Sequence, residues 1–319
     1  MEKVTILLAT YNGEKYVAEQ LDSILKQSHS NWQLLIRDDH SSDNTRQIIA
    51  DYQRMHPDRI HFVDDDFGNV GSVQNFNILL QLAKMENYIM FCDQDDFWMP
   101  DKIEATLKHM TEVERQQGAD CPILIHTNFQ YVDTELNPIP SKENFRATRI
   151  DNLELSHFLA QNPVYGCTIM LNRSLANAVG SIPEIAENHD YWTAMVASAF
   201  GVIHYVDYKS ILYRQHDKNV SGSFKDSKAK NRFKRILDRK LLFNNLTKKI
   251  NMVKTFKQIY LRQLSEKQIN LLDNFVKLSI NKNINLFYTN IKNGVRKQGL
   301  SQTMLFYISM IFYKPSEYK

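Results

Sequence analysis

The amino-terminal half of the chain alternates between short apolar runs and segments with helical periodicity, and this alternation constrains the fold more than any other feature. The apolar runs occupy residues 4–10, 32–39, 59–66 and 87–93, and the first of them is rich in β-branched residues. Between them, apolar residues recur every three or four positions over residues 13–28, 41–55 and 72–85. Strands that alternate with helices pair in parallel and carry the helices on the faces of the sheet. The pattern therefore predicts an α/β fold with a mostly parallel sheet.

Beyond residue 100 the alternation loosens but continues to about residue 222. It predicts helices at 101–118, 152–161 and 189–200, and strands at 121–133, at 164–173 and, as two short strands, within 201–216. The remaining sequence is helical in pattern and poor in strands. Lys and Arg number 18 against 31 Asp and Glu over residues 1–224, but 21 against 5 over residues 225–319. We therefore expect an α/β domain at residues 1–222 and a basic helical region at residues 223–319.

Polar residues follow the first four predicted strands at the point where each strand ends. They are Thr10, Tyr11 and Asn12, then Asp38 and Asp39, then Asp64, Asp65 and Asp66, and finally Asp93, Gln94, Asp95 and Asp96. In open parallel sheets, ligands bind beyond the carboxyl ends of the strands. The sequence therefore predicts a functional site at this edge of the sheet.

The loop after the fourth strand concentrates negative charge in an Asp-x-Asp arrangement, with Asp93 and Asp95 on either side of Gln94. Carboxylates this close repel one another unless a cation lies among them. Hard oxygen ligands suit Mg²⁺ or Mn²⁺, which can also hold a diphosphate. The alternative is a solvated acidic loop, which is common in proteins. The position of the loop, after a buried strand and beside three other polar turns, favours the metal site.

Two other turns at this edge have features that suit a nucleotide. Asp39 can accept a hydrogen bond from the N–H of a pyrimidine ring or from a ribose hydroxyl. The segment that contains it also fits a simple turn with a helix N-cap. In the first turn, Gly13 permits a tight bend, Tyr11 can stack on a base and Ala9 allows close approach.

Three stretches of this chain, taken in order, resemble the successive signatures of family 2 glycosyltransferases with the GT-A fold. They are ILLATYNGEKYVAEQLDSILKQS, LLIRDDHSSDNT and MFCDQDDFWMPDKIE. The resemblance covers roughly residues 3–222. It implies a GT-A fold, which is Rossmann-like, with a mostly parallel sheet, helices on both faces and here a C-terminal helical extension. It also implies glycosyl transfer from a nucleotide-sugar donor.

The resemblance assigns donor-side roles to the polar edge. The first turn and Asp39 would hold the base, and Asp93 would lie near the ribose. The full donor-side set is Ala9, Thr10, Tyr11, Asp39, Asn69, Gly71, Asp93 and Gln94. Asp95 would coordinate Mn²⁺ or Mg²⁺ on the diphosphate, and His216 resembles the late histidine that completes the metal site in several relatives. A structural or solvated role is the alternative for His216.

The resemblance also implies a carboxylate base that deprotonates the acceptor hydroxyl, and it places this base at Asp190. From the residues alone, Asp190 fits a helix N-cap with first-turn charge equally well. Many family members have Glu-Asp here. This chain has His189 before Asp190, a form similar to the rhamnosyltransferase branch, and the role of His189 stays open. The acceptor side would comprise Tyr165, Gly166, Cys167, His189, Tyr191 and Trp192.

The implied reaction is a single inverting displacement. We expect transfer of L-rhamnose from dTDP-rhamnose to a hydroxyl of a lipid-linked saccharide, in the synthesis of a cell-surface polysaccharide. The sequence lacks the Gln-x-x-Arg-Trp motif of processive relatives, so we expect one sugar, or a few, to be added. The alternatives are the same chemistry with a UDP-hexose, or a non-catalytic protein that binds nucleotide sugars. The presence of Asp95 and Asp190 argues against the second alternative.

The basic region ends in an aromatic-rich apolar run, QTMLFYISMIFYKP. Such a run beside Lys and Arg clusters is typical of a segment that lies in an anionic bilayer interface. No window reaches the roughly 18–20 apolar residues of a membrane span. We therefore expect a cytoplasmic protein, peripheral at the inner face of a bacterial plasma membrane. The other interpretation is a helical subdomain or a homodimer contact.

Two further classes are disfavoured by the sequence. The basic region lacks a recognisable nucleic-acid-binding module, so we expect no nucleic-acid partner. The cysteines, at positions 92, 121 and 167, have neither a pairwise nor a metal-type spacing, which fits a reducing compartment.

Overall fold

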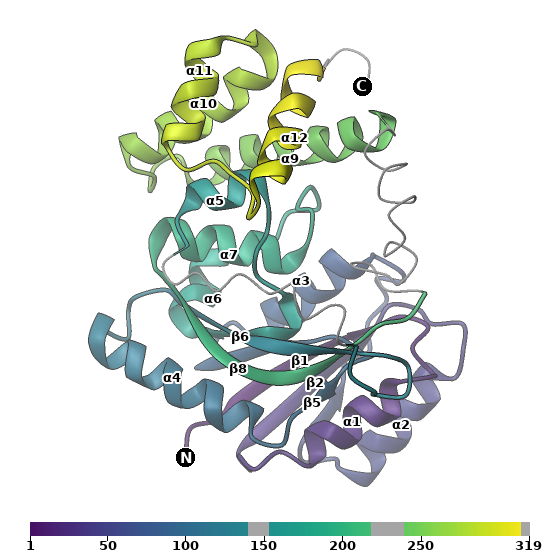
Figure 1. Cartoon of the computed structure of the whole chain (residues 1–319). Helices are drawn as coiled ribbons and strands as arrows, with labels where there is room; N and C mark the ends of the chain where they lie inside the picture. Colours follow the sequence, from purple (N-terminus) through teal and green to yellow (C-terminus); the bar gives the residue numbers. More distant parts are fainter. Residues whose placement is uncertain (140–152, 218–238, 314–319) are drawn as a thin grey trace. The chain divides into compact units, whose positions relative to one another are not determined.

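The computed structural model describes residues 1–139, 153–217 and 239–313. Its central sheet has the strand order β3-β2-β1-β4-β7-β6-β8-β5 (Figure 1). The strands are β1 Val4–Thr10, β2 Trp32–Asp38, β3 Ile60–Phe62, β4 Tyr88–Cys92, β5 Phe97–Trp98, β6 Ile123–Val132, β7 Ile169–Asn172 and β8 Val202–Arg214. Parallel pairing joins β3, β2, β1 and β4, and also β6 and β8, whereas β7 and β5 pair antiparallel. The predicted mostly parallel α/β sheet is confirmed.

Helices cover both faces of this sheet. Figure 1 shows α1, α2 and α4 on one face and α3, α6 and α7 on the other. Their bounds are α1 Val17–Leu25, α2 Thr45–Met55, α3 Ser72–Ala83, α4 Lys102–Gln117, α6 Arg173–Val179 and α7 His189–Phe200. All five residues of β4 are buried, because helices cover the sheet on both sides of this strand. This continuous burial explains why all five residues of β4, just before the Asp-rich loop, are apolar.

Several expected elements differ from the structure in extent. The strand expected at 59–66 is only Ile60–Phe62, and the helix expected at 13–28 is Val17–Leu25. The expected strand at 164–173 begins only at Ile169, because residues Gly166–Thr168 form a 3₁₀ turn. The helix expected from residue 41 begins at Thr45, after a turn in which the Asp43 carboxylate accepts from the Thr45 backbone N–H. The two short strands expected within 201–216 are one strand, β8, which follows β6 through a register shift near Asn128.

The chain divides into two compact units. The first comprises Met1–Asn152, Val164–Glu184 and Asn188–His216, and the second comprises Leu153–Pro163, Ile185–Glu187 and Asp217–Lys319. The domain boundary expected near residue 222 falls within 218–238, outside the described residues. The helices of the second unit are α5 Leu155–Ala160, α9 Arg239–Tyr260, α10 Glu266–Asn281, α11 Ile284–Lys292 and α12 Leu300–Phe312. The predicted C-terminal helical extension is confirmed.

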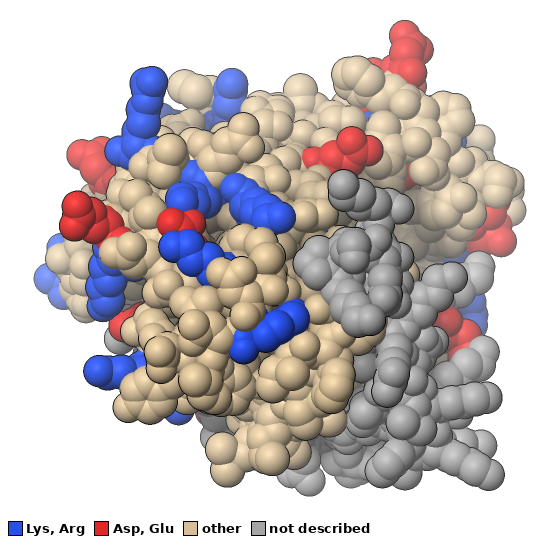
Figure 2. Space-filling view, turned by 90° about the horizontal axis from the view of Figure 1, so that it is seen from above, with Lys and Arg blue, Asp and Glu red and all other residues tan. Residues whose placement is uncertain are grey.

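The second unit has its own apolar core and a basic surface. The buried side chains from α9, α10 and α12 include Val253, Phe256, Leu272, Phe275 and Met310. Figure 2, a view from above, shows Lys and Arg side chains gathered over part of one face. None of the helices that the structure describes is long and apolar enough to cross a bilayer.

Candidate functional site

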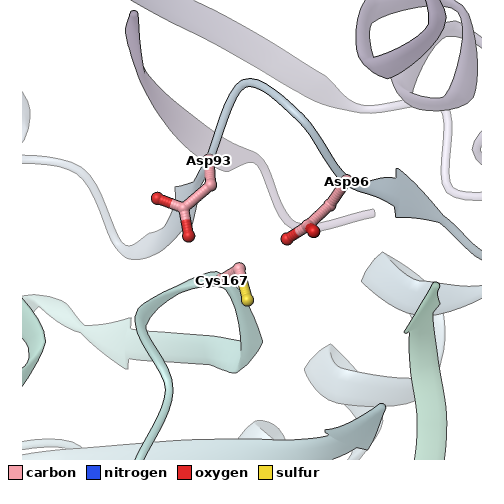
Figure 3. Close-up of side chains that lie close together, drawn as sticks. All are labelled: Asp93, Asp96 and Cys167. Atoms are coloured by element: carbon pink, nitrogen blue, oxygen red, sulfur yellow. The ribbon is translucent and has the colours of Figure 1, made fainter. Parts of the chain in front are cut away.

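Acidic side chains crowd the loop between β4 and β5. Carboxylate oxygens of Asp93 and Asp96 and the sulfur of Cys167 lie within 4.8 Å of one another, and Figure 3 shows these side chains converging. Burial, followed by the nearby Asp95 and Asp190 carboxylates, raises the pKa of Asp93 to about 7. Burial, followed by Asp95 and Asp93, also raises the pKa of Asp96 well above its usual range. Ionised carboxylates are therefore unfavourable in this loop, and a bound cation would stabilise them.

The two residues expected to bind a metal lie together. The Nε2 atom of His216, just beyond the end of β8, is 2.7 Å from Oδ2 of Asp95, and both side chains are partly exposed. The ring of Tyr16 stacks on the His216 imidazole with centroids 5.0 Å apart. A carboxylate oxygen and an imidazole nitrogen, beside an acidic loop, are donors that suit Mn²⁺ or Mg²⁺. The residues present therefore fit a divalent ion.

Arg214 donates hydrogen bonds to two residues of the acidic loop. Its backbone N–H donates to Oδ1 of Asp96 at 3.1 Å, and its Nε donates to the Asp95 carbonyl at 2.9 Å. The rest of the guanidinium donates to the Thr134 carbonyl and to the Glu19 carboxylate. The side chain is buried and lies 4.6 Å over the Tyr16 ring. Arg214 therefore holds the backbone that carries Asp95.

Lys102 is a second buried cation beneath the same loop. It is the first residue of α4, and its Nζ donates to the Cys167 carbonyl at 3.0 Å and to Ser210 Oγ at 3.4 Å. It also lies 4.5 Å over the Trp98 ring. Burial lowers the pKa of Lys102 to about 8. Sequence reasoning missed this residue, because a single Lys in the first turn of an amphipathic helix normally faces solvent.

Gln94 joins the acidic loop to the turn after β1. Its Oε1 accepts from the Tyr11 backbone N–H at 2.8 Å, and its Nε2 donates to the Tyr11 carbonyl at 3.0 Å. A Cβ atom at Gly13 would lie 2.3 Å from the same Oε1, so the glycine makes room for this pairing. The Tyr11 side chain stays 50% exposed and free to stack on a planar ligand. Gln94 therefore aligns two loops of the expected donor side.

Asp39 is the centre of a second polar cluster at this edge. Its carboxylate accepts from Arg37 Nη1 at 3.1 Å and from the backbone N–H groups of Val70 and Gly71, each at 2.8 Å. Asn69 Nδ2 donates to the Asp39 carbonyl at 2.9 Å. The structure thus brings Asp39, Asn69 and Gly71 together, as the donor-side expectation requires. Arg37, which also pairs with Asp65, was missed because it interrupts a buried strand without any repeating pattern.

Thr10 and Ala9 complete the expected donor-side group. Thr10, the last residue of β1, is buried, and its hydroxyl donates to Oδ2 of Asp38 at 2.8 Å. Ala9 is partly exposed beside it. The structure therefore places the eight residues of the donor-side prediction at the end of β1 and in the loops that follow β1, β2, β3 and β4.

Asp190 lies in the first turn of α7. Its Oδ1 accepts from the Tyr191 backbone N–H at 2.6 Å, and the helix N-terminus favours negative charge at this position. The Asp190 carboxylate also contributes to the raised pKa of Asp93. A Cβ atom at Gly166 would lie 3.4 Å from the Asp190 Cβ, so the 3₁₀ turn passes directly against the candidate base.

His189 is buried beside Asp190 and fixes the turn around it. Its ring stacks on Phe76 with centroids 3.7 Å apart and meets the edge of Phe91 at 4.7 Å. Its Nε2 would lie 2.8 Å from a Cβ atom at Gly166, so only glycine fits there without displacement of the ring. Burial lowers the pKa of His189 to about 3, so the imidazole is neutral at physiological pH.

The remaining acceptor-side residues divide into two groups. Tyr165 meets the aromatic rings of Phe129 and Tyr213, and Cys167 lies at the acidic loop. Tyr191 and Trp192, in contrast, are buried in the core. The structure therefore brings Tyr165, Gly166, Cys167 and His189 to the site and places Tyr191 and Trp192 in the packing beneath it.

The neutral His189 leads to a prediction on stability. The unfolded chain takes up a proton near pH 6.5, whereas the folded state does so only near pH 3. Protonation therefore favours the unfolded state between these values, and wild type should lose about 1.4 kcal/mol of unfolding free energy per pH unit below 6.5, relative to His189→Gln. Urea unfolding from pH 4.5 to pH 7.5 measures both slopes. Parallel slopes for the two proteins would contradict a buried neutral His189.

Comparison with known proteins decides the family. The family model described as "Glycosyl transferase family 2" matches residues 5–170, about half of the chain. The chain belongs to this family. The "dTDP-rhamnosyl transferase RfbG" of Shigella flexneri is 31% identical to this transferase over 238 residues, which cover 70% of this chain and 76% of the relative. The expectation of a family 2 glycosyltransferase is confirmed.

Solved structures support the GT-A fold of the transferase. The structure of S. aureus TarS 1-349 in complex with UDP-GlcNAc matches with a TM-score of 0.56 and 16% identity, over 98% of this chain and 82% of that one. The mannosyltransferase PcManGT from Pyrobaculum calidifontis, in complex with GDP-Man and Mn²⁺, matches with a TM-score of 0.50 and 16% identity, over 97% and 87% of the two chains. The transferase therefore has the same fold as enzymes that bind nucleotide sugars.

Proposed function

We propose that this transferase moves L-rhamnose from dTDP-rhamnose to a hydroxyl of a lipid-linked saccharide, with inversion at the anomeric carbon, during synthesis of a cell-surface polysaccharide. The observation that carries the proposal is that the Gly166–Thr168 turn contacts both Asp190 and the acidic loop. A Cβ atom at Gly166 would lie 3.4 Å from the Asp190 Cβ, and the Cys167 sulfur lies within 4.8 Å of carboxylate oxygens of the acidic loop. This arrangement sets an acceptor-side carboxylate against a donor-side loop, as a direct displacement requires. The likeness to the Shigella flexneri rhamnosyl transferase supports the choice of sugar.

Different residues of the site carry proton transfer, metal binding and base recognition in the proposed reaction. Asp190 accepts the proton of the acceptor hydroxyl as the oxygen attacks the anomeric carbon, and the N-terminus of α7 orients this carboxylate. Asp95 and His216 would hold Mn²⁺ or Mg²⁺, which when bound neutralises negative charge on the departing diphosphate. Tyr11 stacks on the base, and the cluster around Asp39 lines the base and ribose side.

The acceptor approaches the site past the 3₁₀ turn at Gly166 and the ring of Tyr165. Because such an acceptor carries a lipid, we place the protein in the cytoplasm at the inner face of the bacterial plasma membrane, with residues 223–319 as the membrane-facing region. A homodimer contact through the same region is the alternative. We propose no nucleic-acid partner.

A second donor class fits the same geometry. TarS was solved with UDP-GlcNAc and PcManGT with GDP-Man, and both share the fold of this chain. Choice of sugar depends on few pocket contacts, so a UDP-hexose donor is the competing proposal. A non-catalytic protein that binds nucleotide sugars would not need the Asp190 carboxylate.

Release of nucleoside diphosphate from a panel of donors tests the proposal. We expect turnover of dTDP-rhamnose with Mn²⁺ or Mg²⁺ and a lipid-linked acceptor, and loss of turnover in EDTA that added Mn²⁺ restores. Turnover of a UDP-sugar alone would replace the rhamnose assignment with the second donor class. Donor binding by calorimetry without release from any donor, even with acceptors supplied, would favour the non-catalytic alternative.

A further inference from the structure

Two neighbouring helices of the second unit expose apolar side chains along one face each. On α12, Leu300, Met304, Ile308 and Ile311 recur every three or four residues, and Phe312 lies beside them. Each is exposed, Leu300 to 87% and Met304 to 65%. Residues three and four apart share one side of a helix, so these side chains form a stripe along α12.

α11 carries a shorter stripe of the same kind. Ile284, Tyr288 and Ile291 lie one turn apart, and Ile284 is 74% exposed. The two helices contact each other through the rings of Phe287 and Tyr307, whose centroids are 4.6 Å apart. We call the exposed apolar residues of α11 and α12 the helical stripes. Scattered exposed apolar residues are ordinary, but two adjoining rows of them indicate an interaction surface.

The charge around the helical stripes restricts what can cover them. α12 contains no charged residue, and the only one in α11 is Lys292. Over residues 243–313 the sequence has eleven Lys and Arg against two acidic residues, Glu266 and Asp273. Several of the basic side chains are exposed, among them Lys277, Lys282, Lys292 and Arg296. Basic residues also gather over part of the face in Figure 2. A second copy of this unit would bring the same positive charge against it, which opposes self-association.

We infer that the helical stripes insert into the interfacial zone of an anionic lipid bilayer, with the surrounding Lys and Arg on the headgroups. A surface that is apolar along its helices and positive around them complements a bilayer that is apolar inside and negative outside. α12 has 13 residues and is about 20 Å long, too short to cross a hydrocarbon core of about 30 Å. The helices therefore lie in the plane of the interface. The inference deepens the proposed function, because a lipid-linked acceptor is presented at such a surface.

A matched pair of double variants tests the inference in the full chain. Met304→Glu with Ile308→Glu places two charges on the α12 stripe. Gln302→Glu with Asn285→Glu places the same two charges on exposed polar positions of α12 and α11 that lie outside the helical stripes. Both pairs alter exposed side chains, and circular dichroism checks that each variant folds. Cosedimentation is measured with phosphatidylcholine vesicles, with and without phosphatidylglycerol.

Wild type should sediment with the vesicles that contain phosphatidylglycerol and much less with phosphatidylcholine alone. The stripe variant should bind at least about tenfold more weakly, and the control variant should lose no more than about threefold, because only the first buries charge in the interface. Equal binding by the two variants, or no binding by wild type, would overturn the inference. So would a dimer, seen by analytical ultracentrifugation, that the stripe variant alone abolishes. Diphosphate release without vesicles should be equal in both variants, which separates this test from the test of the proposed function.

Discussion

Asp190→Asn should lower kcat for diphosphate release by about 10²–10⁴-fold and leave donor affinity nearly unchanged. The carboxylate lies in the first turn of α7 against the acidic loop, where it can take the proton of an acceptor hydroxyl. An amide of the same shape cannot take that proton, and general base catalysis contributes about this much to a rate. The Asn side chain still offers an oxygen to the Tyr191 backbone N–H, so the turn should persist. Steady-state kinetics and donor calorimetry measure the two quantities.

Asp51→Asn is the matched control for this substitution. Asp51 is an exposed carboxylate on α2 that pairs with Arg54. Its replacement by Asn makes the same chemical change outside the site. Its kcat should equal that of wild type. If Asp190→Asn kept more than a tenth of wild-type kcat, another group would have to be the base. If it lost donor binding together with kcat, Asp190 would be structural.

Arg214→Met should weaken both stability and metal-dependent activity. The guanidinium supplies the Asp95 and Thr134 carbonyls with hydrogen bonds, and Met cannot replace them. A fully buried acceptor left without a partner costs about 1–3 kcal/mol. Because these two carbonyls are partly buried, we expect the lower half of that range for each and a loss of about 2–4 kcal/mol in the free energy of unfolding. Residues that orient a metal ligand typically change metal affinity or activity by about 10–100-fold. The Mn²⁺ concentration for half-maximal diphosphate release should therefore rise, which a purely structural role would not produce.

Arg115→Met provides the comparison for Arg214. Arg115 is an exposed residue of α4 that pairs with Glu112 one turn away, and exposed pairs of this kind contribute less than about 1 kcal/mol. Its Mn²⁺ dependence should match that of wild type. An Arg214→Met protein with reduced stability but an unchanged Mn²⁺ requirement would show that Arg214 supports the fold without positioning Asp95.

The sheet could be predicted because its buried strands are continuous apolar runs in the sequence. β4 is buried on both faces, so its five residues are all apolar, and the change to Asp at its end marks the sheet edge. The turns after β1 and β2 could be predicted for the same reason. The pairing of Asp95 with His216, 121 positions away, could not follow from spacing and was expected only through resemblance to a family.

The buried cations could not be predicted, because each is a single residue without a periodic signal. Arg37 interrupts an apolar strand, and Lys102 is in the first turn of a helix, where a Lys normally faces solvent. Their partners come from other parts of the fold, which the sequence pattern does not show. The continuity of β8 was missed because Asp207 and Lys209 interrupt its apolar pattern. The register shift beside Asn128 accommodates them, and the Asn128 amide donates to the Asp207 carboxylate.

The pairing between Gln94 and the Tyr11 backbone, which spans 83 positions of sequence, also limits how this site can change during evolution. A side chain at Gly13 would collide with the Gln94 amide, and a shorter residue at position 94 would leave the Tyr11 peptide without its partners. Neither position can be altered alone without cost. Under the proposed function, the base-binding turn and the diphosphate-binding loop would therefore be inherited together, and residues outside this pair would have to accommodate a new donor nucleotide.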